Sequence, residues 1–168
     1  MNTSSIKMLG LSSILMLSVV FLSFCQERAS PPKTAEGTVN GAKITINYSS
    51  PAVKGRTIWG DLVPYGKVWR AGANEATIFE TSKDIKVEGQ PLPAGKYSLF
   101  VIPSEDESTV IFNKQTGQWG TQYDESQDVL RVPIRGRENN FEENLTYEVL
   151  SDGFELRWAD GAGKVNIE

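Results

Sequence analysis

The chain has 168 residues, of which 39% are hydrophobic and 23% are charged, and its formal net charge is -4. Neither its 17 basic nor its 21 acidic residues form a run long enough to attract nucleic acid, so we expect no nucleic-acid partner. Histidine is absent and there is one cysteine, which excludes a Ser-His-Asp triad, a Cys-His nucleophile and ordinary zinc or copper sites. We expect no metal and no cofactor. Carboxylate chemistry, a Ser or Lys nucleophile and binding without catalysis remain open.

Residues 1–24 have the features of a secretory signal peptide. Lys7 and the amino terminus supply positive charge, and residues 8–24 contain no ionisable side chain. Cys25 follows directly, which resembles a bacterial lipoprotein signal, in which the cysteine is lipidated and becomes the first mature residue. Phe24 departs from that pattern, because a small residue normally precedes the cysteine. We expect a periplasmic or outer-membrane lipoprotein; a secreted soluble protein and an uncleaved signal anchor are the alternatives.

Residues 25–37 are predicted to form a tether. They are polar and are interrupted by Pro31 and Pro32, which favours an extended linker. Residues 38–168 are then long enough to form one domain with a hydrophobic core of its own.

Alternating apolar and polar residues predict a β-rich domain. Residues 44–48 and 154–158 have apolar side chains at every second position, as half-buried strands do, and residues 145–149 repeat the pattern. More continuously apolar segments, expected to be central strands, lie at residues 97–102, 109–112 and 129–132.

Turn signals separate these segments. Asn40-Gly41, Asp152-Gly153 and Asp160-Gly161 are predicted hairpin turns, because glycine accepts the positive φ that tight turns require. Beyond the signal, no long window has helical spacing. The sequence therefore predicts an all-β fold, an antiparallel β-sandwich or a jelly roll, and neither a Rossmann nor a P-loop nucleotide site.

The segment from Gly55 to Thr81 is the most unusual part of the chain. It mixes tryptophan and tyrosine with several glycines and ionisable residues, which implies a specific local geometry. An aromatic wall with a few convergent polar groups is the usual construction of a small-molecule or sugar site. The candidate ligand-binding residues are Trp59, Tyr65, Trp69, Arg70, Asn74 and Glu75.

The same residues also have a structural interpretation. Arg70 and Glu75 could form a buried ion pair across a bend at Asn74, a residue type that tolerates left-handed backbone. Trp59 and Trp69 would then be core residues, since large aromatic side chains often fill cores. The sequence leaves both interpretations open.

A catalytic role would require a second carboxylate near Glu75. Glu80 would face the opposite side of a regular strand, so Asp61 is the better partner. Glu75 with Asp61 would make a carboxylate-based, glycosidase-like hydrolase. The sequence favours a binding function, and the hydrolase is the alternative.

Several motifs resemble those of a known family. In chain order they are VPYG, VWRAGANEAT, AGKYSLFVIP and WG, within a region from about residue 50 to residue 132 that also contains VIFNKQTGQWG and YDESQDVLRV. This combination closely resembles the bacterial exported family catalogued as domain of unknown function 2911. The resemblance implies a periplasmic or lipid-anchored β-rich protein, and it carries over no substrate and no catalytic residue.

These observations together predict an exported, lipid-anchored β-sandwich protein. We expect a binding or envelope-associated module that uses its Trp/Tyr/Arg-lined surface to hold a small molecule, a glycan or an envelope protein.

Overall fold

The computed structural model describes residues 28–168. The predicted signal peptide, Cys25 and the first residues of the predicted tether lie outside these residues. The strands are β1 (Pro32–Val39), β2 (Ala42–Ser49), β3 (Thr77–Thr81), β4 (Ile85–Val87), β5 (Gln90–Leu92), β6 (Gly95–Ile102), β7 (Glu107–Asn113), β8 (Asp128–Leu150) and β9 (Gly153–Asn166). Within residues 28–168 the helical structure is limited to one 3₁₀ turn, η1 (Glu125–Gln127). The predicted all-β class is confirmed.

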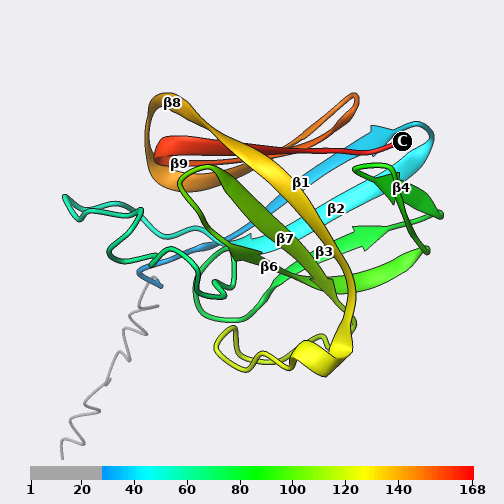
Figure 1. Cartoon of the computed structure of the whole chain (residues 1–168), viewed down its shortest axis with the longest axis horizontal. Coiled ribbons are helices and arrows are strands. Elements are labelled where there is room, and N and C mark those ends of the chain that lie inside the picture. Colours follow the sequence, from blue (N-terminus) through cyan, green and yellow to red (C-terminus); the bar gives the residue numbers. More distant parts are fainter. Residues whose placement is uncertain (1–27) are drawn as a thin grey trace, which may run out of the picture.

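The strands form a meander. A seven-stranded sheet has the order β1-β2-β3-β6-β7-β8-β9 (Figure 1). The chain that joins β3 to β6 forms a separate hairpin of β4 and β5. The neighbouring strands of both sheets are antiparallel. Neighbouring strands of this sheet follow one another along the chain, apart from the β4–β5 hairpin that is inserted between β3 and β6 in the sequence.

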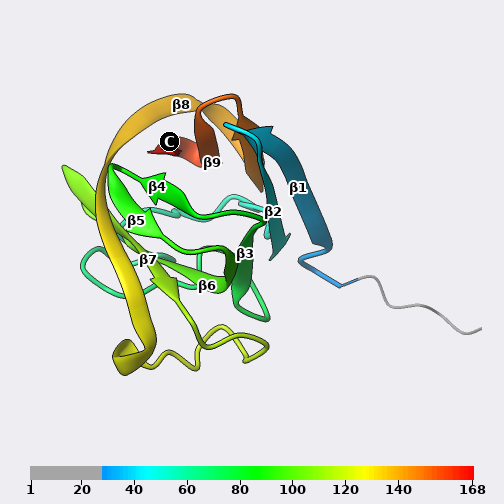
Figure 2. The same ribbon diagram turned by 90° about the vertical axis from the view of Figure 1, so that its right-hand side faces the viewer.

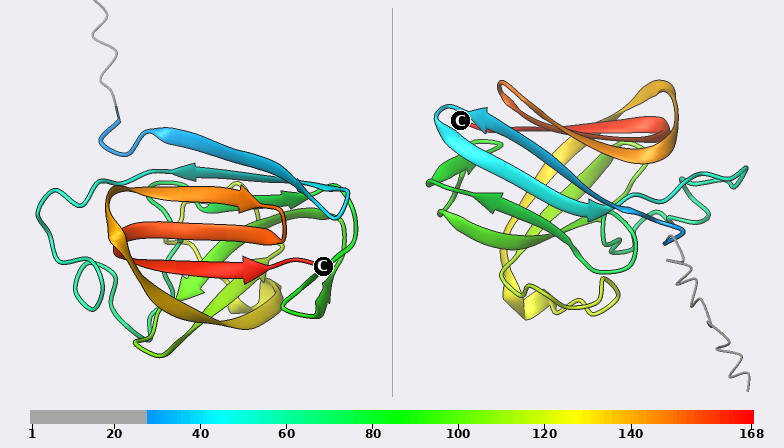
Figure 3. Two further views of the ribbon diagram at one scale, coloured as in Figure 1. Left: turned by 90° about the horizontal axis from the view of Figure 1, so that it is seen from above. Right: turned by 180° about the vertical axis from the view of Figure 1, so that it is seen from behind.

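β8 belongs to both layers of the fold. Its first part pairs with β7 from Asp128 to Arg135, and the remainder, from Gly136 to Leu150, pairs with β9. The strand therefore curves from one layer into the other, and Figure 2 shows it arching over the molecule. As a result, the second part of β8 and β9 form one layer, which lies over the layer that contains β3, β6 and β7 (Figure 3).

The other end of the sheet closes against β8. Val53 N donates to Glu143 O at 2.7 Å, and Leu145 N donates to Pro51 O at 2.9 Å. Gly37 of β1 also packs closely on Val149, since a Cβ at Gly37 would lie 2.6 Å from Val149 Cγ1. These contacts make the sheet nearly a closed barrel.

The core lies between the two layers. Phe79 of β3 packs edge-on against Phe112 of β7, with ring centroids 5.1 Å apart, and against Phe154 of β9 at 5.5 Å. Ile44 and Ile46 are fully buried on the same side, so the alternation that predicted β2 is confirmed.

A smaller apolar cluster covers the opposite face of the central strands. Phe100 of β6 and Ile111 of β7 are fully buried there, and the ring of Tyr123 packs against Phe100 at 4.9 Å. This second cluster explains why the two strands are apolar on both faces.

Two sequence predictions differ from the structure. β1 begins at Pro32, inside the predicted tether. An edge strand can begin with proline. The sequence does not reveal this strand, because Ala35 and Val39 are its only buried hydrophobic residues and do not make a clear alternating pattern. Asp160-Gly161 is not a turn, since Gly161 pairs with Glu138 inside β9. The positive φ at this point belongs to Ala159, at 52°, where the pairing with β8 is irregular. Asn40-Gly41, with φ of 48° and 78°, is the predicted tight turn.

Candidate functional site

The long connection between β2 and β3 carries most of the predicted site residues. It is fixed to the sheet by main-chain hydrogen bonds: Trp69 and Val101 exchange two, at 2.7 and 2.8 Å, and Gly66 N donates to Pro103 O at 2.8 Å. This segment therefore continues the sheet beside the end of β6, although it is not a regular strand. Its aromatic side chains are held by paired backbone, which favours a preformed site.

Three tryptophans from this connection and from β9 form one cluster. The rings of Trp59 and Trp69 meet edge to face with centroids 5.8 Å apart, and Trp69 stacks on Trp158 at 5.9 Å with an interplanar angle of 15°. Trp158 is 1% exposed and belongs to the core, whereas Trp59 and Trp69 are only partly buried. The cluster thus extends from the core to a surface pocket.

That pocket has a volume of about 670 Å³. Trp59, Tyr65 and Trp69 line it from the connection, and Phe141 of β8, which is 65% exposed, lies at its rim. We call it the aromatic pocket. Its size is in the range of small-molecule sites.

Small residues of β8 and β9 provide the space. The lining includes Gly136, Gly161, Ala162 and Gly163, whose side chains add little or no volume. Gly161 lies directly under Trp59, because a Cβ there would be 2.6 Å from Trp59 Nε1. The pocket exists because bulky aromatic residues on one side face a glycine-rich strand pair on the other.

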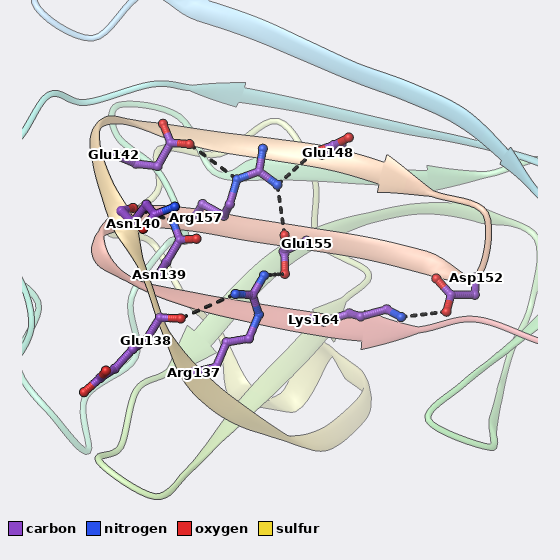
Figure 4. Close-up of polar contacts among 10 residues, drawn as sticks. All are labelled: Arg137, Glu138, Asn139, Asn140, Glu142, Glu148, Asp152, Glu155, Arg157 and Lys164. Carbon is purple, nitrogen blue, oxygen red and sulfur yellow. Dashed lines mark hydrogen bonds and ion pairs between the residues drawn. The ribbon is translucent and has the colours of Figure 1, made fainter.

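The charged lining combines three carboxylates with two arginines, Arg56 and Arg137. Glu105, Glu138 and Asp160 line the pocket, and none of them forms an ion pair within residues 28–168. Arg137 also lines it, but its guanidinium donates to Glu155 on the charged face of the β8–β9 hairpin, as Figure 4 shows. The pocket therefore presents hydrogen-bond acceptors beside its aromatic wall.

The predicted site residues fall into three groups. Trp59, Tyr65 and Trp69 share the aromatic pocket. Arg70 and Asn74 line a second pocket, which Trp69 also borders. Glu75 and Asp61 line neither pocket, so the two candidate catalytic carboxylates are not brought into these hollows.

The predicted ion pair between Arg70 and Glu75 is wrong. Glu75 Oε1 accepts instead from Arg28 Nη1 at 3.0 Å, and both side chains are about half exposed. Asn74 has φ of 59°, the left-handed conformation that asparagine tolerates. The backbone of the next residue, Glu75, forms an isolated antiparallel β-bridge with Trp119. The aliphatic part of Arg70 packs instead against Gly120, so Arg70 and Glu75 have different partners.

The two most distinctive motifs of the sequence lie side by side. Ala76 N donates to Gln118 O at 3.2 Å, and Gly120 N donates to Asn74 O at 3.0 Å. The QWG segment is thereby paired with the ANEA segment. Their specific residues serve this close pairing, in which glycine leaves room for Arg70.

The YDESQDVLRV motif forms a structural network. Tyr123 Oη donates to Asp128 Oδ2 at 2.6 Å, and Arg131 Nε donates to the same oxygen at 2.8 Å. Asn113 Nδ2 donates to Asp128 Oδ1 at 2.8 Å. Burial and the Asp128 carboxylate raise the pKa of Tyr123 to about 12, so it stays a neutral donor. This network fastens the loop after β7 to β8.

Sequence reasoning missed the β8–β9 side of the aromatic pocket. Phe141 is an isolated aromatic residue in the polar run ENNFEEN, and this pattern alone indicates that its side chain is exposed, as it is in the structure. The sequence predicts a turn at Asp160-Gly161, and nothing in the sequence around Glu138 distinguishes it from other exposed acidic residues. Their approach to Trp59 depends on the curvature of β8, which no local pattern encodes.

A protein-family model described as "Protein of unknown function (DUF2911)" matches residues 30–167. The chain belongs to this family. No curated protein and no solved structure matches it. Within residues 28–168, no helix has the length and apolar character needed to span a bilayer. The same part of the chain contains no group of three or more Cys, Asp or Glu side chains placed to hold a metal ion.

Proposed function

We propose that this DUF2911 protein is a binding protein of the bacterial envelope whose aromatic pocket holds a glycan-like ligand, a ring that carries several hydroxyl groups. The observation that carries the proposal is the meeting of Trp59, Trp69 and Tyr65 with unpaired carboxylates in one hollow of about 670 Å³.

The aromatic wall suits the apolar faces of a sugar ring. Tyr65 is 41% exposed, and Trp59 and Trp69 are partly exposed while their contact with buried Trp158 fixes them. A rigid aromatic surface loses little conformational entropy when a ligand stacks on it. The wall is therefore prepared for a ring before the ligand arrives.

The carboxylates suit the hydroxyl groups of the same ligand. An ionised carboxylate accepts hydrogen bonds and donates none, so Glu105, Glu138 and Asp160 would accept hydrogen bonds from the ligand's hydroxyl groups. Hydrogen bonds to charged groups are also stronger than those between neutral groups. A neutral polyhydroxyl ring fits this combination better than an anionic ligand does.

The hydrolase alternative has less support. Glu75 is paired with Arg28, and neither Glu75 nor Asp61 lines the aromatic pocket. A glycosidase would need both carboxylates to flank one bond of the bound substrate. The proposed function is therefore binding without catalysis.

Intrinsic tryptophan fluorescence tests the proposal. Three of the four tryptophans are clustered at the aromatic pocket, so titration with cellobiose, chitobiose and maltose should change the emission of residues 28–168. Trp59→Ala and Tyr65→Ala should each weaken binding about ten-fold or more, which corresponds to about 1.4 kcal/mol. Trp119→Phe is the matched control, because Trp119 is 49% exposed and lines neither pocket. Absence of any response to all three sugars, or equal losses in the control, would contradict a sugar site.

The envelope location is proposed on sequence grounds. The apolar run that ends at Cys25 supports export followed by lipidation. Labelling of cells with a radioactive fatty acid should then mark the wild-type protein and not Cys25→Ala. An unlabelled wild-type protein recovered from the medium would support the secreted alternative.

A further inference from the structure

The second pocket lies beside the aromatic pocket and has a different chemical character. Its volume is about 380 Å³, and Arg56 and Trp69 border both pockets. Three cationic residues line it: Lys54, Arg56 and Arg70. Its lining contains no Asp or Glu. We call it the cationic pocket. A concave surface of one charge sign attracts ligands of the opposite sign.

Arg70 is the central residue of this pocket. It forms neither a hydrogen bond through its side chain nor an ion pair within residues 28–168, and its Nε atom is buried. Buried donors without a partner are rare because each loses its hydrogen bond to water. The Nη1 and Nη2 atoms of the same side chain form no hydrogen bond within the described residues and are not buried, so they are the donors that a ligand in this pocket can reach.

The position of Arg70 is enforced by its surroundings. Gly120 packs on the aliphatic part of its side chain, and a Cβ there would lie 2.8 Å from Arg70 Cβ. Gly120 is itself fixed by its hydrogen bond to Asn74 O at 3.0 Å. The side chain is therefore confined before any ligand binds, which reduces the entropy lost on binding.

Arg56 is also held in place. Its Nε donates to Val53 O at 3.0 Å and its Nη2 donates to Ala52 O at 2.6 Å. These bonds to its own turn leave Nη1 for another acceptor. Within the described residues Arg56, Arg70 and Arg135 form no ion pair, and of these Arg56 and Arg70 line the cationic pocket.

We propose that the cationic pocket binds an oxyanion, the carboxylate or phosphate group of a ligand. The planar guanidinium groups of Arg70 and Arg56 match the geometry of such groups, and Lys54 adds positive charge. Asn74 Nδ2, which donates to Ser30 O at 3.3 Å, borders the same space. The proposal does not depend on which ligand the aromatic pocket holds, although Arg56 and Trp69 border both pockets.

NMR of the arginine Nε–H groups tests the proposal directly. The ¹⁵N-labelled protein, residues 28–168, is titrated with sodium phosphate and, separately, with glucuronate, at constant ionic strength. Glucose is the neutral match of glucuronate. The Arg70 Nε–H signal reports on the Nη groups of the same guanidinium, so it should shift and saturate with an oxyanion and should not respond to glucose. The Arg131 Nε–H signal is the internal control, because its donor is already bonded to Asp128 at 2.8 Å.

The two titrations also separate the sources of the oxyanion. Saturation with phosphate alone identifies a phosphate site, and saturation with glucuronate alone identifies a carboxylate site; both together support a general oxyanion site. If the Arg70 signal fails to shift with either probe, or shifts without saturation in parallel with that of Arg131, the proposal is wrong.

Substitutions give a second measurement. Arg70→Gln should weaken oxyanion binding at least about ten-fold, and Arg70→Lys should restore only part of it, because lysine keeps the charge but not the planar pair of donors. Lys54→Gln, at an exposed position, should weaken binding about two- to five-fold without affecting the fold. Tyr65→Ala, which changes only the aromatic pocket, should leave oxyanion binding unchanged. Equal oxyanion affinity in wild type and in folded Arg70→Gln, or in wild type and Lys54→Gln, would overturn the assignment.

Discussion

Gly120 lies against the side chain of Arg70, and this contact joins two segments that are fifty residues apart in the chain. A methyl group on Gly120 would overlap Arg70 Cδ and lie 2.9 Å from Asn74 O. Gly120 does not have a positive φ, so its backbone conformation does not require glycine. Glycine is needed here because a larger side chain would not fit. The WG motif and the VWRAGANEAT motif therefore form one structural unit.

Gly120→Ala should destabilise the protein. The added methyl group has to displace either the stem of Arg70 or the backbone at Asn74, and overpacking of this kind costs about 1 to 3 kcal/mol. The midpoint of thermal unfolding, followed by circular dichroism, should fall by about 3 to 10 °C.

Gly136→Ala is the matched control for this substitution. The nearest heavy atom to a Cβ at Gly136 is Ala162 O at 3.9 Å, which is ordinary contact. No loss of stability is expected there, because alanine also restricts the unfolded chain more than glycine does. Equal losses at both positions would mean that the Gly120–Arg70 contact is not responsible.

Glu75→Gln should have little effect on stability. Its partner Arg28 is about as exposed as Glu75 itself, and exposed ion pairs contribute up to about 1 kcal/mol. The pKa of Glu75 is lowered by a hydrogen bond from its own backbone and then by Arg28. Chemical denaturation should give nearly the same free energy of unfolding for wild type, Glu75→Gln and Arg28→Gln. A loss of several kcal/mol would instead indicate a buried charge.

The sequence predicts the strands better than the site. Ile44 and Ile46 alternate with polar residues because one face of β2 is buried, and this physical cause acts locally. The aromatic wall could also be predicted, since Trp59, Tyr65 and Trp69 occur close together. Local patterns were sufficient where the structure depends on neighbouring residues.

Long-range geometry decided the parts that could not be predicted. β8 carries two apolar segments separated by the charged run RGRENNFEE, so it reads as two strands, although the structure has one continuous curved strand. That curvature brings Gly161 under Trp59. The partner of Glu75 likewise depended on the left-handed turn at Asn74, which directs Glu75 away from Arg70.

Gly161→Ala should alter the aromatic pocket. The new Cβ would lie 2.6 Å from Trp59 Nε1 and 3.0 Å from its Cε2, so the indole has to move. Because Trp59 contacts Trp69 and Trp158, we expect a shift of the fluorescence maximum and at least about a five-fold loss of affinity for a pocket ligand. Gly136→Ala adds a methyl group to the same pocket lining without a close contact and should keep the wild-type emission. Unchanged emission of Gly161→Ala would show that Trp59 is not held by this contact.

Glu155 links two arginines on the β8–β9 hairpin. The residue is 6% exposed, and it accepts hydrogen bonds from Arg137 and, at 2.9 Å, from Arg157 (Figure 4). Burial acts to raise the pKa of Glu155, but the hydrogen bonds from Arg157 and Arg137 outweigh it, and the pKa lies below the ordinary value of 4.5. The carboxylate is therefore more stable in the folded protein than in the unfolded chain.

The stability that Glu155 contributes should consequently depend on pH. As the pH falls below about 4.5 the unfolded chain takes up the proton first, so this contribution is present above that pH and is lost as the pH falls through the folded pKa. Glu155→Gln should cost about 1 to 3 kcal/mol at pH 7, less than a fully buried pair because Arg137 is half exposed, and the difference from wild type should shrink by pH 3. Urea denaturation at both pH values measures this. Glu148→Gln is the control: its half-exposed carboxylate accepts a hydrogen bond from the same Arg157 at 2.8 Å, so only a small loss of stability is expected at pH 7. If Glu155→Gln lowers the free energy of unfolding by the same amount at both pH values, the loss comes from the packing and hydrogen bonding of the amide and not from the missing charge.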